Sequence, residues 1–143
     1  MKTFILLVVS ATALTFAATT MASHEASPTL TAASSKYGKV LFDGRGYVLY
    51  AFTKDRRQSA CSGDCARAWP PYIVRGSLKA GANVKRSLLG TVGRANGSRQ
   101  LTYAGRPLYY YVGDKQPGQI LCQNASEFGG LWLVVRPNGK LVR

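Results

Sequence analysis

Hydrophobic and polar positions alternate along most of the chain in short runs that glycine, proline and asparagine interrupt. Short runs rich in Tyr, Val and Leu and bounded by turn residues are typical of β-strands. An Asn-Gly pair between two such runs is a strong signal for a tight hairpin. Three hairpins are predicted in this way: 40–42 with 47–52, 89–92 with 101–103 around Asn96-Gly97, and 131–135 with 141–142 around Pro137-Asn138-Gly139.

The same pattern occurs twice. GYVLYAFTKD at 46–55 recurs as GRPLYYYVGD at 105–114, an offset of 59 residues, and runs that begin at Trp69 and Trp132 follow at an offset of 63. A single small sheet cannot cover its own apolar face, so two similar units must pack on each other. We predict an all-β domain, mainly antiparallel, of two duplicated β units packed as a sandwich or irregular barrel. The predicted repeats are about 37–75 and 96–143, with short helical turns at 64–68 and 84–88.

The N-terminus has the pattern of a secretory signal. Lys2 precedes an apolar stretch that runs from Phe4 to Ala18, and small residues then lead to Ala22. The apolar stretch is shorter than the roughly 20 residues that span a bilayer. We therefore predict a signal peptide at 1–22 cleaved near Ala22, a secreted or periplasmic protein and no integral membrane segment. The small, polar residues 23–36 predict a flexible leader, followed by a single domain at 37–143.

Charge then suggests a class of partner. After loss of the signal, 18 basic side chains remain against 6 acidic ones, a net charge of +12 spread along the chain. Such a domain favours anionic surroundings such as membrane phosphates, wall polymers or acidic polysaccharide. Nucleic acid is not expected, because the aromatic residues do not alternate with basic ones as a stacking platform requires.

The composition argues against most enzyme classes. The only histidine is His24, in the predicted leader. This position excludes a Ser-His-Asp or Cys-His nucleophile and an ordinary His-ligated zinc or iron site within the domain. Near a new N-terminus His24 could chelate copper, which we interpret as accidental. Paired carboxylates could serve a glycan-active enzyme, but most of them sit in turn-like segments, so we expect no enzyme. The candidates are Asp43, Asp55, Asp64, Asp114 and Glu127.

The cysteines leave alternatives open. Cys61 and Cys65 are predicted to form a disulfide, because an exported protein meets an oxidising compartment. A redox-active pair is the alternative, although the C-x-x-C spacing of thiol oxidoreductases is absent. Cys122 is a buried small hydrophobe, a partner of Cys61 or Cys65, or a bridge to another chain. A Cu(I) site of Cys61, Cys65 and Cys122 is conceivable, but no spacing requires it.

The repeated Tyr and Asp positions are the candidate ligand site. Strand geometry turns Tyr50 and Phe52 to one face, as it does Tyr109 and Tyr111. The structural interpretation makes the following aspartates turn residues and the tyrosines core, with their hydroxyls tied to a partner. The alternative is two equivalent ligand sites. These sites are Tyr50 with Asp55 and Tyr109 with Asp114.

These residues resemble a known family of secreted or lipoprotein repeats with a Yx(FWY)xxD motif. Tyr50–Asp55 and Tyr109–Asp114 both match that motif, and the similarity extends through CSGDCARAWPP at 61–71, the segment 88–111 and GGLWLVV at 129–135. The resemblance implies a bacterial, cell-envelope-associated protein of two repeats, and it implies no reaction. Many members are lipoproteins, but this chain has no cysteine at the end of its predicted signal.

We therefore expect a non-catalytic envelope or extracellular binding module without a cofactor. Its spread lysines and arginines would contact anionic polymers, and exposed tyrosines would add contact area. The alternative function is redox or copper handling by Cys61 and Cys65, with or without Cys122.

Overall fold

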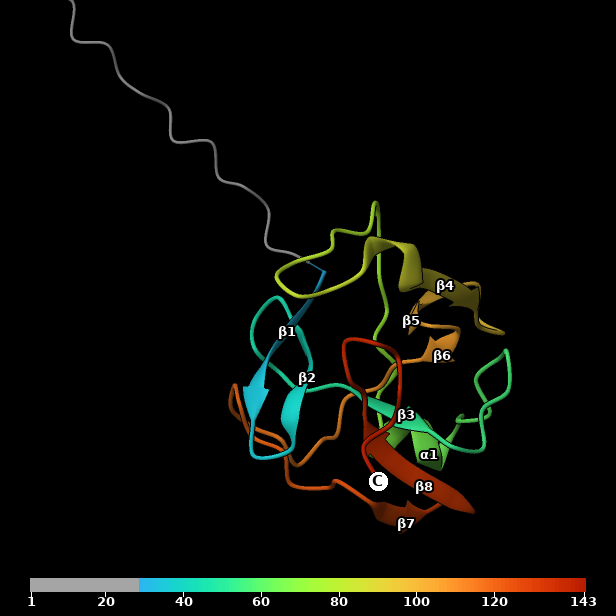
Figure 1. The fold of residues 1–143 in the computed structure, drawn as a ribbon. Coiled ribbons are helices and arrows are strands. Elements are labelled where there is room, and N and C mark those ends of the chain that lie inside the picture. Colours follow the sequence, from blue (N-terminus) through green and yellow to red (C-terminus); the bar gives the residue numbers. More distant parts are fainter. Residues whose placement is uncertain (1–28) are drawn as a thin grey trace, which may run out of the picture.

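A computed structural model describes residues 29–143, so the predicted signal peptide and the first part of the predicted leader lie outside the described residues. Most of the regular secondary structure belongs to three antiparallel sheets, which occupy separate regions of Figure 1. In order of pairing, the sheets contain β1 (Leu30–Ser35) and β2 (Gly38–Asp43); β3 (Tyr50–Phe52), β8 (Gly130–Val134) and β7 (Ala125–Glu127); and β4 (Leu89–Gly93), β5 (Arg99–Tyr103) and β6 (Arg106–Pro107).

The predicted all-β class is confirmed, and the described sheets do not close into a barrel. The two segments that favoured helical turns contain α1 (Asp64–Ala68) and the 3₁₀ turn η1 (Arg86–Leu88). Neither of these helices in the described part of the chain is long and apolar enough to cross a bilayer.

The start of the domain differs from the prediction. Leu30–Ser35 form β1 and pair with β2 along their whole length, so the prediction of a flexible leader up to Lys36 is wrong for this segment. Leu30 and Ala32 are buried, while the residues between and after them are more exposed. The segment is short and weakly apolar, and its strand conformation comes from pairing with β2 rather than from its own propensity.

The repeat boundaries also move toward the N-terminus. Leu89–Gly93 form β4 and pair with β5 as β1 pairs with β2, so the second repeat begins with this hairpin and not near residue 96. The hairpin turn itself is as predicted. Gly97 has a φ of 80°, a left-handed conformation that suits glycine, and the Asn96 side chain accepts the Ser98 N–H at 3.0 Å.

The other two predicted hairpins exist only as short bridges. Phe42 pairs with Val48, and Val135 pairs with Leu141. The main pairing partners of these strands are different: β2 pairs with β1, and β3 pairs with β8.

The two repeats interlock through their motif segments, which are β3 in the first repeat and an isolated bridge at Tyr109 in the second. Tyr50 and Tyr109 exchange two backbone hydrogen bonds, each of 2.9 Å. Tyr50 also pairs with Val134 in the second Trp-led run, and Tyr109 pairs with Pro71 in the first. Each motif segment therefore pairs with residues of the other repeat.

The strand β3 is buried on both faces. Tyr50 and Phe52 enter an aromatic core that also contains both tryptophans, while Leu49 and Ala51 enter a second, mainly aliphatic core. The alternation expected for this strand is confirmed. Burial of both faces places the motif strand at the centre of the molecule.

Candidate functional site

The motif tyrosines and aspartates meet across the repeats. The Tyr50 hydroxyl donates to Oδ2 of Asp114, and the Tyr109 hydroxyl donates to Oδ2 of Asp55, each at 2.8 Å. The sequence suggested pairs within each motif. The structure brings the same four residues together in the opposite combination.

Each aspartate also holds a turn of its own repeat. Oδ1 of Asp55 accepts the Ala60 N–H at 2.7 Å, and Oδ1 of Asp114 accepts the Leu121 N–H at 3.0 Å. Both carboxylate oxygens of both residues are thereby engaged. This is the arrangement that the structural interpretation of the motif expects.

Burial raises the pKa values of the side chains in this cluster. Desolvation raises the pKa of Asp55 and of Asp114 above the ordinary value of 3.8, although their hydrogen bonds act in the opposite direction. Desolvation also raises the pKa of Tyr50 and of Tyr109, so both hydroxyls stay protonated donors at neutral pH.

We expect these two carboxyl groups to favour the folded state more in acid than at neutral pH. A raised folded pKa means that the folded state binds the proton more tightly. The resulting stabilisation is complete below the unfolded value near 3.8 and disappears as the pH rises through the folded pKa. Urea unfolding of wild type and of Asp55→Asn/Asp114→Asn across pH measures it. The free energy of unfolding of wild type should exceed that of the double variant by more in acid than at neutral pH. A difference that grows toward neutral pH would contradict the raised pKa of the two aspartates.

The remaining motif residues belong to an aromatic stack. Trp69 and Trp132 lie parallel with their rings 4.0 Å apart, and Phe52 stacks on Trp132 at 4.2 Å. Tyr111 packs on the other tryptophan, Trp69, at 4.8 Å. The neighbouring Cys122 side chain raises the pKa of Tyr111. Phe52 and Tyr111 are thus packing residues of this core.

The cysteines take the simplest of the predicted arrangements. Cys61 and Cys65 form the predicted disulfide, and both are buried. Burial limits attack by an external thiolate. Cys122 is a free, half-buried cysteine. Residues 29–143 bring no three His, Cys, Asp or Glu side chains together as a metal site, and the disulfide engages two of the three sulfurs suggested for copper.

The other candidate carboxylates also have partners. Asp64 forms an ion pair with Arg67 in α1, and Oε2 of Glu127 accepts the Trp69 Nε1–H at 2.7 Å. Asp43 binds Arg45. The carboxylates that could have served a glycan-active enzyme therefore have structural partners within the fold.

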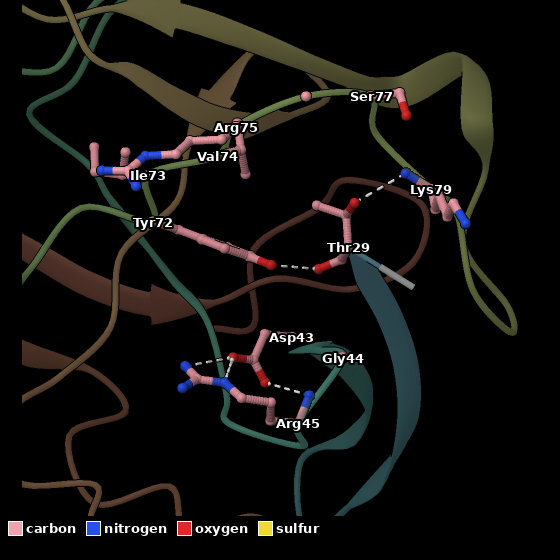
Figure 2. Close-up of a pocket in the computed structure, with 11 residues that line it drawn as sticks. Thr29, Asp43, Gly44, Arg45, Tyr72, Ile73, Val74, Arg75, Ser77 and Lys79 are labelled. Carbon is pink, nitrogen blue, oxygen red and sulfur yellow. Dashed lines mark hydrogen bonds and ion pairs between the residues drawn. The ribbon is translucent and has the colours of Figure 1, made fainter. Parts of the chain in front are cut away.

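A cavity of about 540 Å³ opens at the first repeat, beside the start of β1. Figure 2 shows that it lies between the β2–β3 loop, which supplies Arg45, and the long connection after α1, which supplies Tyr72 to Lys79. Its lining residues are Thr29, Asp43, Gly44, Arg45, Tyr72, Ile73, Val74, Arg75, Gly76, Ser77 and Lys79.

Asp43 organises one wall of this cavity. Its Oδ1 accepts the backbone N–H groups of Arg45 and Tyr47, each at 2.9 Å, and its Oδ2 accepts the Tyr110 hydroxyl at 3.0 Å. Oδ2 also binds the Arg45 guanidinium through Nε and Nη2, each at 3.0 Å. The hydrogen bond to Asp43 raises the pKa of Arg45, which remains a cation with a fixed position.

The other two cationic side chains of the cavity are free to bind an anion. Arg75 and Lys79 are exposed, and neither side chain forms an ion pair within residues 29–143. The cavity therefore has three cationic side chains and one carboxylate, which is buried and already paired with Arg45.

Two further cavities continue this one on either side. One of about 370 Å³ shares Arg45 and adds Lys115, and another of about 420 Å³ shares the Ile73–Arg75 segment and adds Arg99. We call the three together the basic groove. Its cations are Arg45, Arg75, Lys79, Arg99 and Lys115.

The sequence predicted spread positive charge but singled out none of the five groove cations. It did name Asp43, Tyr111 and Asp114, which line the same cavities, for other reasons. The groove forms where four segments that are distant in the sequence meet, 43–48, 70–79, 96–99 and 110–115. The only local signal was the Asp43-Gly44-Arg45 turn, which reads as a hairpin turn rather than as a site.

The family model described as a secreted repeat of unknown function matches residues 31–72 and 90–136. The two matched segments correspond to the two repeats seen in the structure. No curated protein and no solved structure shows significant similarity to the chain. Arg45 and Tyr72 lie within the first matched segment, and Arg75 and Lys79 lie outside both.

Proposed function

Because the chain belongs to the family of secreted repeats of unknown function, we propose that it is an extracellular, non-catalytic module that binds anionic ligands in the basic groove. The family supports a location outside the cell, and the Cys61–Cys65 disulfide is compatible with that location. The identity of the ligand class rests on the groove alone.

The observation that carries the proposal is the charge balance of the central cavity. Arg45, Arg75 and Lys79 surround it, and the one lining carboxylate is already bound to Arg45. Its volume of about 540 Å³ lies within the roughly 300–1,000 Å³ typical of ligand sites. An anion that enters meets cationic donors and no free carboxylate.

The second repeat also lacks the counterparts of two side chains that line the central cavity, Arg45 and Tyr72. The offset of 59 residues places Ala104 opposite Arg45, and the offset of 63 places Val135 opposite Tyr72. The duplicated framework therefore does not require these side chains, since the second repeat forms its strands and core without them. This difference supports a role in binding rather than in folding.

We expect Arg75→Ala/Lys79→Ala to weaken binding of a sulfated polysaccharide such as heparin by about tenfold or more. Hydrogen bonds to charged groups contribute about 1.5–3 kcal/mol each, and about 1.4 kcal/mol is tenfold in affinity. Titration calorimetry at low salt measures the change. Raising the salt concentration should weaken wild-type binding and reduce the difference between the two proteins.

The matched control is Arg56→Ala/Arg57→Ala, which removes the same charge from exposed residues that do not line the groove. It should retain most of the wild-type affinity. Equal losses in both double variants would show that net charge, and not the groove, determines binding.

A further inference from the structure

We infer that the anionic ligand is an acidic polysaccharide, whose sugar rings pack on tyrosines at one end of the basic groove while its acid groups bind the cations. This inference rests on the proposed function, because it names the ligand of the same groove. The cavity that Arg45 and Lys115 both line carries the inference.

That cavity is aromatic as well as basic. Tyr47, Tyr110 and Tyr111 line it together with Val112, and Arg45 and Lys115 supply its two cations. The three tyrosines are half-buried. Asp114 also lines the cavity, but it is buried and both its carboxylate oxygens accept hydrogen bonds from the protein.

Hydrogen bonds fix two of these rings before any ligand binds. The Tyr110 hydroxyl donates to Asp43 at 3.0 Å, and the Tyr47 hydroxyl donates to the Lys115 carbonyl at 3.3 Å. The Arg45 guanidinium lies 5.1 Å from the centre of the Tyr47 ring. Pre-ordered rings lose little conformational freedom on binding, which favours affinity.

These features match the chemistry of a sugar acid. A pyranose ring presents an apolar C–H face that packs against an aromatic ring. The planar carboxylate or tetrahedral sulfate that the ring carries accepts hydrogen bonds from guanidinium. Arg45 lines both the aromatic cavity and the central one, so one ligand can contact Tyr47 and Arg45 together. A bare polyphosphate has charge but no apolar ring face and gains nothing from the tyrosines.

The three cavities adjoin through Arg45 on one side and through Arg75 on the other. An extended chain could therefore pass from the tyrosines to Arg99, with successive acid groups on successive cations. A linear polysaccharide has this form.

The test compares Tyr47→Phe and Tyr47→Leu with wild type by titration calorimetry, using a galacturonic acid oligomer and a linear polyphosphate of equal chain length. Tyr47→Phe keeps the ring and should bind the oligosaccharide within about twofold of wild type. Tyr47→Leu loses the ring face and should bind it about tenfold more weakly, the effect of one aromatic contact. Polyphosphate affinity should be unchanged in both variants.

Thermal unfolding verifies that both variants remain folded, and Lys115→Gln provides a second probe at the same cavity. Equal losses for the two ligands in Tyr47→Leu, or no loss in either, would overturn the polysaccharide assignment and leave the proposed anion site standing. Tighter binding of a single-stranded DNA oligonucleotide of equal charge would replace the polysaccharide with nucleic acid. Failure of wild type to bind any of these polyanions would contradict the proposed function itself.

Discussion

Trp132→Ala is expected to lower the free energy of unfolding by about 3–5 kcal/mol, the usual cost of deleting a large buried aromatic ring. Trp132 is fully buried, lies between Trp69 and Phe52 in a parallel stack, and meets the edge of Tyr109. Domains of this size have a total stability of about 5–15 kcal/mol, so the variant approaches the limit of folding. Urea unfolding followed by far-UV circular dichroism measures the change.

The two tryptophans differ in the hydrogen bonding of their indole N–H groups, which provides an internal control. Trp69 Nε1 donates to Glu127, whereas Trp132 Nε1 is buried with no acceptor among the described residues. Replacement of Trp69 by phenylalanine removes a hydrogen bond to Glu127. Replacement of Trp132 by phenylalanine removes a buried donor that has no acceptor among the described residues. Trp69→Phe should therefore cost about 0.5–1.5 kcal/mol more than Trp132→Phe. A larger cost for Trp132→Phe would show that its indole N–H has a partner in solution.

Tyr50→Phe should destabilise the domain by about 1–3 kcal/mol, because it leaves a buried acceptor without its donor. The sharper expectation concerns the identity of that acceptor. In a double-mutant cycle Tyr50→Phe should couple with Asp114→Asn and combine additively with Asp55→Asn. Tyr109→Phe should show the reverse pattern, coupling with Asp55→Asn.

Chemical unfolding of the single and double variants gives the coupling energies. Coupling of about 0.5–3 kcal/mol is typical of residues in direct contact. If Tyr50 coupled with Asp55 instead, the tyrosine and aspartate would interact within one repeat, and the observed hydrogen bonds across the repeats would not represent the protein in solution.

The sequence predicts well the features that depend on neighbours along the chain. Asn96-Gly97 forms its turn because the local backbone needs a left-handed residue there. The alternation of Leu49, Tyr50, Ala51 and Phe52 between two cores follows from strand geometry alone. The close spacing of two cysteines in an exported chain was enough to predict the disulfide.

The sequence predicts poorly the features that depend on distant partners. Leu30–Ser35 form a strand only because β2 lies beside them. The tyrosine and aspartate positions were evident, but identical motifs cannot reveal which aspartate each hydroxyl meets. The basic groove joins Arg45 to Arg75 and Lys79 through loop conformations that no short pattern encodes.

The reciprocal bonds between Tyr50 and Asp114 and between Tyr109 and Asp55 have the form of an isologous interface, as in a homodimer with two-fold symmetry. The chain is in this sense a covalently linked dimer. A fragment with only the first repeat would have Tyr50 without its acceptor and Asp55 without its donor, and a second copy could supply both. Joining the halves also makes their divergence possible, because a single chain can carry Arg45 in one half and Ala104 in the other. If the basic groove binds as proposed, it offers a directional polymer one binding face with two different ends.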